Sequence, residues 1–153
     1  LKSFKQNGVH VLGSFIFGLS TDREDTFRAT AELAQRAGIT FAQFVMMTPF
    51  PGTVDFQKWE KSLGDDAPKV DGVPITRYWL IPPDKRPKLY TPHPTMGAEE
   101  IRMRTQGVWD LFYRNSAILK RADCVKSLKA KLAFFLISKL YRQMYANTGI
   151  ATD

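Results

Sequence analysis

The fold is decided by two segments, Gly13-Ser-Phe-Ile-Phe-Gly-Leu19 and Phe44-Val-Met-Met-Thr-Pro-Phe-Pro-Gly-Thr53. Each is an apolar run of the kind that forms a buried strand. Each ends in residues that stop a strand: Gly18 in the first segment, and Pro49 with Pro51 in the second. The residues between the two segments have the spacing of one short helix, so together they predict a strand–helix–strand unit.

The expected unit has strands at 9–17 and 39–47 and a helix that ends before Gly38. Thr21 and Glu24 have the spacing of a capping box at the start of that helix. Two strands joined in this way are expected to be parallel, with a right-handed crossover, and their apolar character suits strands covered on both faces. Such units bind ligands at the carboxyl ends of their strands. Because one unit with open edges is not a complete fold, we expect this chain to be part of a larger protein.

The whole chain is predicted to comprise three regions: 1–54, 55–95 and 96–153. The middle region is rich in proline and predicts an irregular excursion with one short strand at Tyr78-Trp-Leu-Ile81. In the last region the apolar residues repeat at helical spacing, with a break at Arg114-Asn-Ser116 and an end near 147–149. The fold class is therefore α/β with a helical carboxyl-terminal extension.

Composition excludes several classes of protein. The 153 residues are 44% hydrophobic and include eleven Phe, five Tyr and three Trp, which argues against disorder. No apolar run approaches the roughly 18 residues of a membrane-spanning helix, and the first residues lack the features of a signal peptide. The one cysteine, Cys124, excludes an internal disulfide and a metal site made of cysteines alone. We therefore expect a cytoplasmic protein.

The net charge of +7 is concentrated in the last third of the chain. No nucleic-acid motif accompanies this charge, so nucleic acid is not the expected partner. A solvated helix face and an anionic surface partner both remain open as explanations. Over Val125–Tyr145, lysines alternate with leucines and phenylalanines, which is typical of helices that lie in a membrane interface. Peripheral membrane contact is one expectation here, and packing of these apolar residues on the protein is the other.

The chain offers few groups for acid–base chemistry. His93, between Pro92 and Pro94, has no matched partner in the sequence, which favours a loop histidine. The pairs Asp65-Asp66 and Glu99-Glu100 are typical of a loop and a helix start rather than of a catalytic dyad. We therefore assign no catalytic residue and no metal ligand within this chain.

A resemblance to radical S-adenosylmethionine (SAM) enzymes rests on Phe15-Ile-Phe-Gly-Leu-Ser-Thr-Asp-Arg-Glu-Asp-Thr-Phe27 and, after a helix, on Thr48-Pro-Phe-Pro-Gly-Thr53. These segments are similar to the late strands of the cobalamin-binding branch and of its methylthiotransferase-like relatives. A looser likeness continues through five later segments: Arg77-Tyr-Trp, Pro94-Thr-Met, Glu99-Glu-Ile-Arg, Val108-Trp-Asp and Tyr141-Arg-Gln-Met-Tyr-Ala-Asn.

The resemblance implies the last strand–helix–strand part of a partial (β/α) TIM-like barrel. It also implies three cofactors: SAM, a 4Fe–4S cluster held by a Cys-x₃-Cys-x₂-Cys loop, and, in this branch, cobalamin. This chain has no such loop, and Cys124 alone cannot replace it. The cluster and the cobalamin would therefore be held by upstream residues that are absent from this chain.

Four residues are carried over by the resemblance as SAM-binding: Ile16, Gly18, Thr48 and Pro49. The first two match the Ile-x-Gly of the strand that contacts adenine, and the last two lie at the mouth of the next strand. Two departures concern the same turn, because Ser20 stands where the family has proline and Asp22 is the nearest acid.

The sequence thus predicts the carboxyl-terminal part of a radical SAM enzyme, inactive without the remainder of its polypeptide. The predicted activity is cobalamin-dependent methyl transfer to a small-molecule substrate that is hydrophobic or lipid-like. Alternatives are a tetrapyrrole cyclase of the same branch, a methylthiotransferase-like enzyme, and a non-catalytic binding or scaffold module. A module would fold cooperatively alone, whereas part of an enzyme would expose open strand edges and an apolar barrel face.

Overall fold

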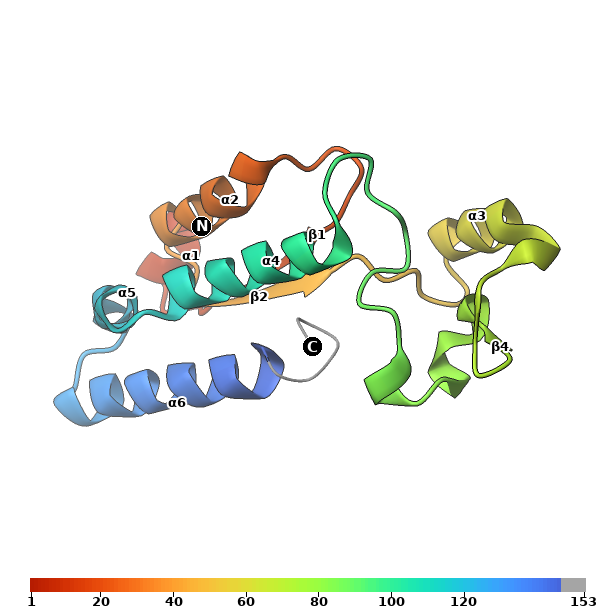
Figure 1. The fold of residues 1–153 in the computed structure, drawn as a ribbon. Coiled ribbons are helices and arrows are strands. Elements are labelled where there is room, and N and C mark those ends of the chain that lie inside the picture. The colour runs from red at the N-terminus through yellow and green to blue at the C-terminus, as the bar shows by residue number, and fades with distance from the viewer. Residues whose placement is uncertain (147–153) are drawn as a thin grey trace.

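The computed structural model describes residues 1–146, in which a two-stranded parallel sheet, the helices around it and a small separate lobe are arranged as in Figure 1. The predicted end of the last helix near 147–149 lies outside the described residues. The helices and strands are α1 (Lys2–Gln6), β1 (Leu12–Phe17), α2 (Glu24–Arg36), β2 (Phe41–Met46), α3 (Val54–Leu63), β3 (Lys69–Val70), β4 (Val73–Pro74), α4 (Ala98–Tyr113), α5 (Asn115–Arg121) and α6 (Leu128–Ala146). Short 3-10 helices occupy Gly64–Asp66, Ile75–Leu80, Pro83–Lys85 and Ala122–Cys124.

The predicted strand–helix–strand unit is confirmed as β1–α2–β2. The two strands are parallel, with Leu12 opposite Phe41 and Phe17 opposite Met46. This register brings the carboxyl ends of both strands to the same edge of the sheet. A ligand site of the expected kind would therefore lie beyond Phe17 and Met46.

The start of α2 differs from the prediction. The helix begins at Glu24, and the expected capping box of Thr21 and Glu24 is wrong. Instead the Thr26 hydroxyl accepts a hydrogen bond of 3.0 Å from the Arg23 amide. The acid of this segment that makes main-chain contacts is Asp22, whose carboxylate serves the preceding turn.

The main core lies between the sheet and two helices, α2 and α4. Phe17 of β1 stacks on Phe27 of α2 with ring centroids 4.5 Å apart. Phe44 of β2 meets Trp109 and Phe112 of α4 edge-on, at 5.5 and 5.6 Å. All five rings are buried, and burying side chains of this size supplies most of the stability of a small core.

The opposite face of β1 is open, so the expectation of a strand covered on both faces is wrong for the described residues. Along β1 exposed and covered residues alternate, and Leu12, Ser14 and Ile16 are the exposed ones. On this face of β2, Phe41 alone has aromatic cover, from Phe134 and another ring of α6. The sheet is therefore covered on one face and mostly bare on the other, in contrast to the two-sided cover that a parallel sheet normally has.

The outer edge of β2 is sealed by α4. Trp109 Nε1 donates a hydrogen bond of 2.8 Å to the carbonyl of Phe44. The Tyr113 hydroxyl donates to the Ala42 carbonyl at 2.8 Å and accepts from the Ala42 amide at 3.0 Å. These side chains make the contacts that a further strand would make, so β2 is hydrogen-bonded on both edges. Open strand edges promote unwanted pairing, and covering them with a helix prevents it.

Residues 54–90 form a small lobe with its own aromatic core. Its hairpin β3–β4 turns at Asp71 and Gly72, both with positive φ. The predicted strand at Tyr78–Ile81 is wrong, because Ile75–Leu80 is a 3-10 helix. Ile75, Tyr78 and Ile81 recur every three residues and are all buried in the lobe core, although the helix is kinked at Arg77 and Ile81 is its extended cap.

The predicted break at 114–116 is confirmed at Arg114, which is extended between the end of α4 at Tyr113 and the start of α5, whereas Asn115 and Ser116 already belong to α5. Arg121 of α5 is buried at the end of α4. Its Nη1 donates to the Phe112 carbonyl at 2.7 Å, and its guanidinium lies 3.8 Å from the Phe112 ring centroid. Burial lowers the pKa of Arg121 to about 10, so this cation is not part of the basic surface. Among the described residues, no helix has the length and apolar character needed to cross a membrane.

Candidate functional site

All four residues carried over by the resemblance lie at the carboxyl end of the parallel pair: Ile16, Gly18, Thr48 and Pro49. The Met47 amide donates a hydrogen bond of 2.7 Å to the Phe17 carbonyl, which holds the two strand ends together. The structure thus brings the predicted residues to one edge of the sheet. Their individual surroundings differ.

Ile16 is the predicted residue that faces open space. Its side chain is 50% exposed, and Val45 lies opposite it in the register on the same face. Leu12, which lies four residues before Ile16 on the same face of β1, is 56% exposed. The carboxyl end of the open face is therefore apolar, and it suits the flat, apolar side of a ligand.

The turn at Gly18 is closed within the chain. Gly18 has φ of +89°, and a Cβ there would lie 3.0 Å from Leu89 Cδ1, so both backbone and space favour glycine. Asp22 Oδ2 accepts hydrogen bonds from the amides of Gly18 at 2.8 Å and Leu19 at 3.1 Å. The acid that departs from the family pattern thus holds the turn. The Gly18 amide is therefore already hydrogen-bonded to a side chain of the protein, and Gly18 itself is buried.

The segment after β2 is a rigid connection to the lobe. The Thr48 hydroxyl donates to a main-chain carbonyl of β2 at 3.3 Å, and Pro49 is fully buried. Thr53 caps α3, since its hydroxyl accepts from the Phe56 amide at 3.1 Å and donates to the Phe50 carbonyl at 2.7 Å. The two ends of the segment are therefore fixed by hydrogen bonds, and its direction by proline.

His93 lies in the loop before α4, beside a cavity of about 280 Å³ that Leu89 also lines. Leu89 is the side chain that meets Gly18, so this cavity adjoins the turn at the end of β1. His93 Nδ1 accepts hydrogen bonds from the Thr95 amide at 3.2 Å and the Met96 amide at 3.0 Å. One ring nitrogen of His93 is therefore committed to shaping the loop.

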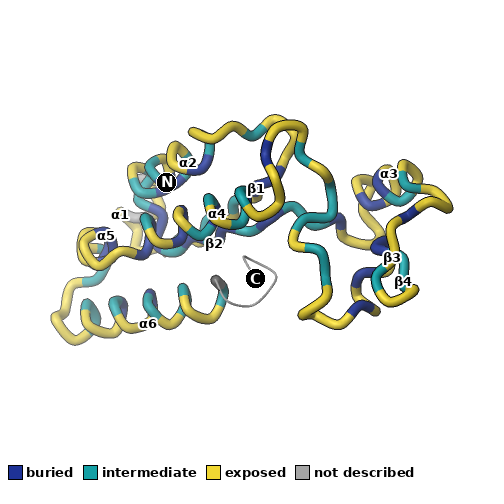
Figure 2. The backbone as a smooth tube through the Cα atoms, in the orientation of Figure 1, coloured by how far each residue is buried: buried dark blue, intermediate teal, exposed yellow. Residues whose placement is uncertain are grey.

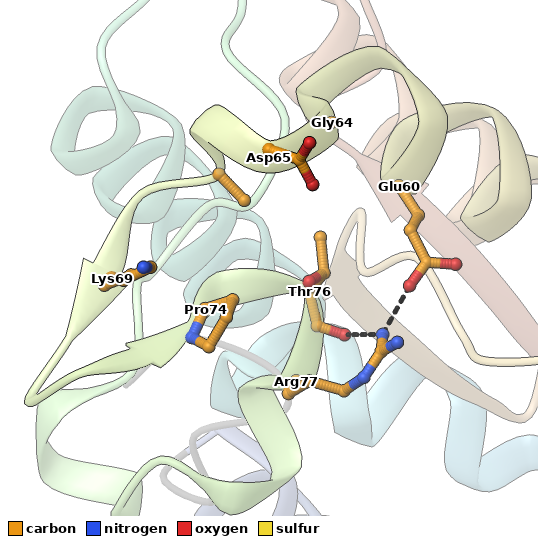
Figure 3. A pocket seen from close by; sticks show the side chains of 8 residues that line it. Glu60, Gly64, Asp65, Lys69, Pro74, Thr76 and Arg77 are labelled. Carbon is orange, nitrogen blue, oxygen red and sulfur yellow. Dashed lines mark hydrogen bonds and ion pairs between the residues drawn. The ribbon is translucent and has the colours of Figure 1, made fainter.

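A second cavity, of about 480 Å³, lies in the lobe, away from the strand ends (Figure 3). Arg77 forms an ion pair with Glu60 and donates to the Thr76 carbonyl at 3.1 Å. Asp65 and Lys69 complete a lining with two acids and two bases, which favours no one ligand charge. Within residues 1–146, no group of three His, Cys, Asp or Glu side chains is placed to hold a metal ion.

Two contributors to the site were missed from the sequence. Leu89, far along the chain, covers the Gly18 turn, and no local pattern indicates such a contact. Asp22 was noted only as a departure, although an acid shortly after a glycine turn is a common acceptor for free turn amides. That spacing was the signal that could have predicted its hydrogen bonds.

Comparison with curated proteins finds partial matches to three enzymes. The chain is 36% identical over 119 residues to an uncharacterized methyltransferase of Pyrococcus horikoshii, covering 78% of this chain and 24% of that protein. It is 28% identical over 122 residues to the bacteriochlorophyllide d C-12(1)-methyltransferase of Chlorobaculum tepidum, covering 79% and 24%. It is 27% identical over 150 residues to the anaerobic magnesium-protoporphyrin IX monomethyl ester cyclase of Rubrivivax gelatinosus, covering 95% and 25%.

The chain therefore spans about a quarter of the length of the curated relatives it matches. No protein-family model and no solved structure matches it. The likeness is distant, and it is to methyltransferases and to a cyclase.

Proposed function

We propose that this chain is the carboxyl-terminal part of a cobalamin-dependent radical SAM methyltransferase that acts on a large hydrophobic molecule. The partial matches to two methyltransferases support the activity. The name of one of them specifies a bacteriochlorophyllide, which supports an extended apolar substrate. In this proposal the chain supplies the last two strands of the barrel and the helices beyond them.

The observation that carries the proposal is the asymmetry of the sheet. The outer edge of β2 is sealed by Trp109 and Tyr113, whereas no strand of the described residues pairs with the outer edge of β1. The face that carries Ile16 is bare as well. A sheet with one sealed edge and one bare face fits the end of a partial barrel. Earlier strands would continue from β1, and the bare face would line the interior.

The residues present fit SAM in one respect only. Ile16 is apolar and half-exposed at the carboxyl end of β1, so it can cover one side of an adenine ring. When bound, SAM supplies the carbon or the radical on which the chemistry of the family depends. The described residues have no ligand set for an iron–sulfur cluster, and the chain contains a single cysteine. In this proposal other parts of the polypeptide hold the cluster and the cobalamin.

In this proposal the chain contributes the shape of the site and excludes water from it. Ile16 and Val45 present apolar surface at the carboxyl end of the bare face, which excludes water from that side. Asp22 holds the Gly18 turn, and Pro49 fixes the exit of β2. No residue of this group carries a proton to or from a reacting atom.

The test is SAM binding by the native polypeptide that contains these residues, purified without oxygen. We expect Ile16→Asp to weaken SAM binding at least about tenfold in equilibrium dialysis, because a buried carboxylate would face the adenine. The matched control is Leu33→Asp, at a leucine of α2 that is 54% exposed on another surface, and it should bind SAM normally. Unchanged binding by Ile16→Asp, or no SAM binding by the native polypeptide, would contradict the proposal.

A second candidate function, ring formation on a tetrapyrrole, is favoured by one observation. The match to the magnesium-protoporphyrin IX monomethyl ester cyclase covers 95% of this chain, more than either methyltransferase match. Mass spectrometry of the product separates the two functions, because methyl transfer adds a CH₂ unit whereas ring formation adds no carbon. Magnesium-protoporphyrin IX monomethyl ester is the substrate to supply.

A further inference from the structure

An apolar stripe runs along the outside of α6. Its members are spaced four residues apart, so consecutive members adjoin on the helix surface and the stripe winds across the outer half of the helix. They are Leu128, Leu132, Leu136, Leu140 and Met144, with exposures of 84, 61, 53, 63 and 55%. Figure 2 shows this side of α6 as exposed, turned away from the rest of the chain. Contiguous exposed apolar surface of this kind usually marks an interaction site.

The opposite side of α6 fixes the orientation of the helix. Phe134 is 6% exposed, and its ring lies 5.4 Å from that of Phe41 in β2. Tyr141 packs on Phe41 and Tyr113, with ring centroids 5.5 and 6.1 Å away. These contacts hold α6 against the sealed edge of β2. The leucine stripe therefore faces outward because the helix is anchored by its other side.

The charge around the stripe is positive. Apart from the buried Arg121, residues 115–146 contain six lysines and arginines against one acid, Asp123. Lys120, Lys126 and Lys129 are exposed and have no ion pair within the described residues. Lys129 lies on the helix beside Leu128 and Leu132, so apolar and cationic groups share one surface.

We propose that this surface binds an anionic lipid membrane, with α6 lying in the interface. Leucines would enter the boundary between headgroups and acyl chains, and the lysines would meet acidic headgroups. A second copy of the chain fits less well, because a symmetric contact would place the same lysines opposite one another. The proposal does not depend on the reaction that the whole protein catalyses.

The test is flotation of the native polypeptide with vesicles at low salt. We expect binding to phosphatidylcholine vesicles that contain phosphatidylglycerol, and little binding to phosphatidylcholine alone. Leu132→Asp/Leu136→Asp should reduce the bound fraction about tenfold or more. The matched control, Leu33→Asp/Leu80→Asp, changes two leucines that are 54 and 64% exposed outside α6, and it should bind normally.

The charge is tested separately by Lys126→Gln/Lys129→Gln. This variant should lose several-fold in binding to the anionic vesicles. The control, Lys58→Gln/Lys61→Gln in α3, removes the same charge from another exposed helix and should not. A gain is expected from Leu136→Trp, because tryptophan favours the membrane interface.

Failure of the native polypeptide to float with anionic vesicles would overturn the proposal. So would normal binding by Leu132→Asp/Leu136→Asp. If instead those substitutions lower the melting temperature strongly and no vesicle binding is seen, another part of the same polypeptide covers α6, and the membrane proposal is wrong.

Discussion

The two strands of the sheet are the same length and similarly apolar, yet their surroundings are opposite. β2 is hydrogen-bonded along both edges, to β1 on one side and to Trp109 and Tyr113 on the other. β1 has a partner on one edge only among the described residues, and Ile16 on its bare face is half-exposed. The sequence of an apolar strand therefore does not indicate whether the edge of that strand is hydrogen-bonded. Side chains distant in the sequence determine it.

The largest expected effect comes from breaking the sealed edge with Trp109→Ala. Trp109 is fully buried and donates to the Phe44 carbonyl, so the variant loses packing and leaves a carbonyl without its partner. We expect a loss of about 3–5 kcal/mol in the free energy of unfolding of the sheet region. Chemical denaturation, with hydrogen exchange of the sheet amides as the probe, measures this loss of free energy. The control Trp79→Ala, at a ring 42% exposed in the lobe, should cost less than about 1 kcal/mol.

Tyr113→Phe removes only the polar part of the seal. The hydroxyl makes two hydrogen bonds with Ala42, and both Ala42 groups would be left buried without partners. We expect a loss of about 2 kcal/mol, because each unsatisfied buried group costs about 1–3 kcal/mol less any relaxation. The Ala42 amide should exchange much faster in the variant. Unchanged exchange at Ala42 would show that the hydroxyl does not seal this edge.

The same hydroxyl predicts a sensitivity to alkali. Burial raises the pKa of Tyr113 well above its ordinary value of 10.0. Below about pH 10 the folded and unfolded states both keep the proton, so the stabilisation by this group is complete. Above that pH the unfolded state loses the proton first, and stability falls as pH rises. The difference between wild type and Tyr113→Phe should therefore shrink above pH 10, and a constant difference would contradict the direction of the shift.

A smaller effect is expected at the carboxyl end of β1. Gly18→Ala forces a side chain into φ of +89° and within 3.0 Å of Leu89, at a cost of about 1–2 kcal/mol or slightly more. Gly52→Ala is the matched control, because Gly52 has φ of +87° and no neighbour within 4 Å of the added Cβ. Thermal denaturation should show Gly18→Ala as the more destabilised of the two. Equal losses would mean that Leu89 does not restrict this turn.

The smallest effect is expected at the first turn of α4, away from both strand edges. Hydrogen bonds from Arg102 lower the pKa of Glu99 to about 2, from an ordinary value of 4.5. The stabilisation by Glu99 is therefore complete above about pH 4.5 and is lost as pH falls toward 2. Glu99→Gln should flatten this part of the stability curve slightly, and salt should weaken the effect. If the stability of Glu99→Gln still fell with decreasing pH as steeply as that of the wild type, Glu99 would not be the source of this pH dependence.

Local patterns predicted the parts of the fold that are set by local chemistry. The β1–α2–β2 unit followed from strand-stopping glycine and prolines around a helical pattern. The start of α4 near Glu99 and Glu100 followed from acids typical of a first turn, and its end before Arg114 followed from a break in the apolar spacing. The same patterns located the predicted binding residues at one edge of the sheet, because parallel strands share their carboxyl ends.

The remaining features depend on contacts between distant residues. The sealing of β2 joins residues 65 and 71 positions apart in the chain, and no spacing rule indicates it. The bare face of β1 was missed because an apolar strand was taken to be covered on both faces. The 3-10 helix at Ile75–Leu80 was mistaken for a strand because β-branched and aromatic residues favour strands, whereas its inward side chains recur every three residues.

The most direct test of the account is amide hydrogen exchange in β1 of the native polypeptide that contains this chain. The Val11 and Phe17 carbonyls accept amides from the β2 side, so the Ser14 amide points to the unpaired edge. The account predicts that another strand of the same polypeptide pairs there, which would protect the Ser14 amide as strongly as the Ala42 amide. Rapid exchange at Ser14, with Ala42 protected, would contradict the proposed place of this sheet at the end of a barrel.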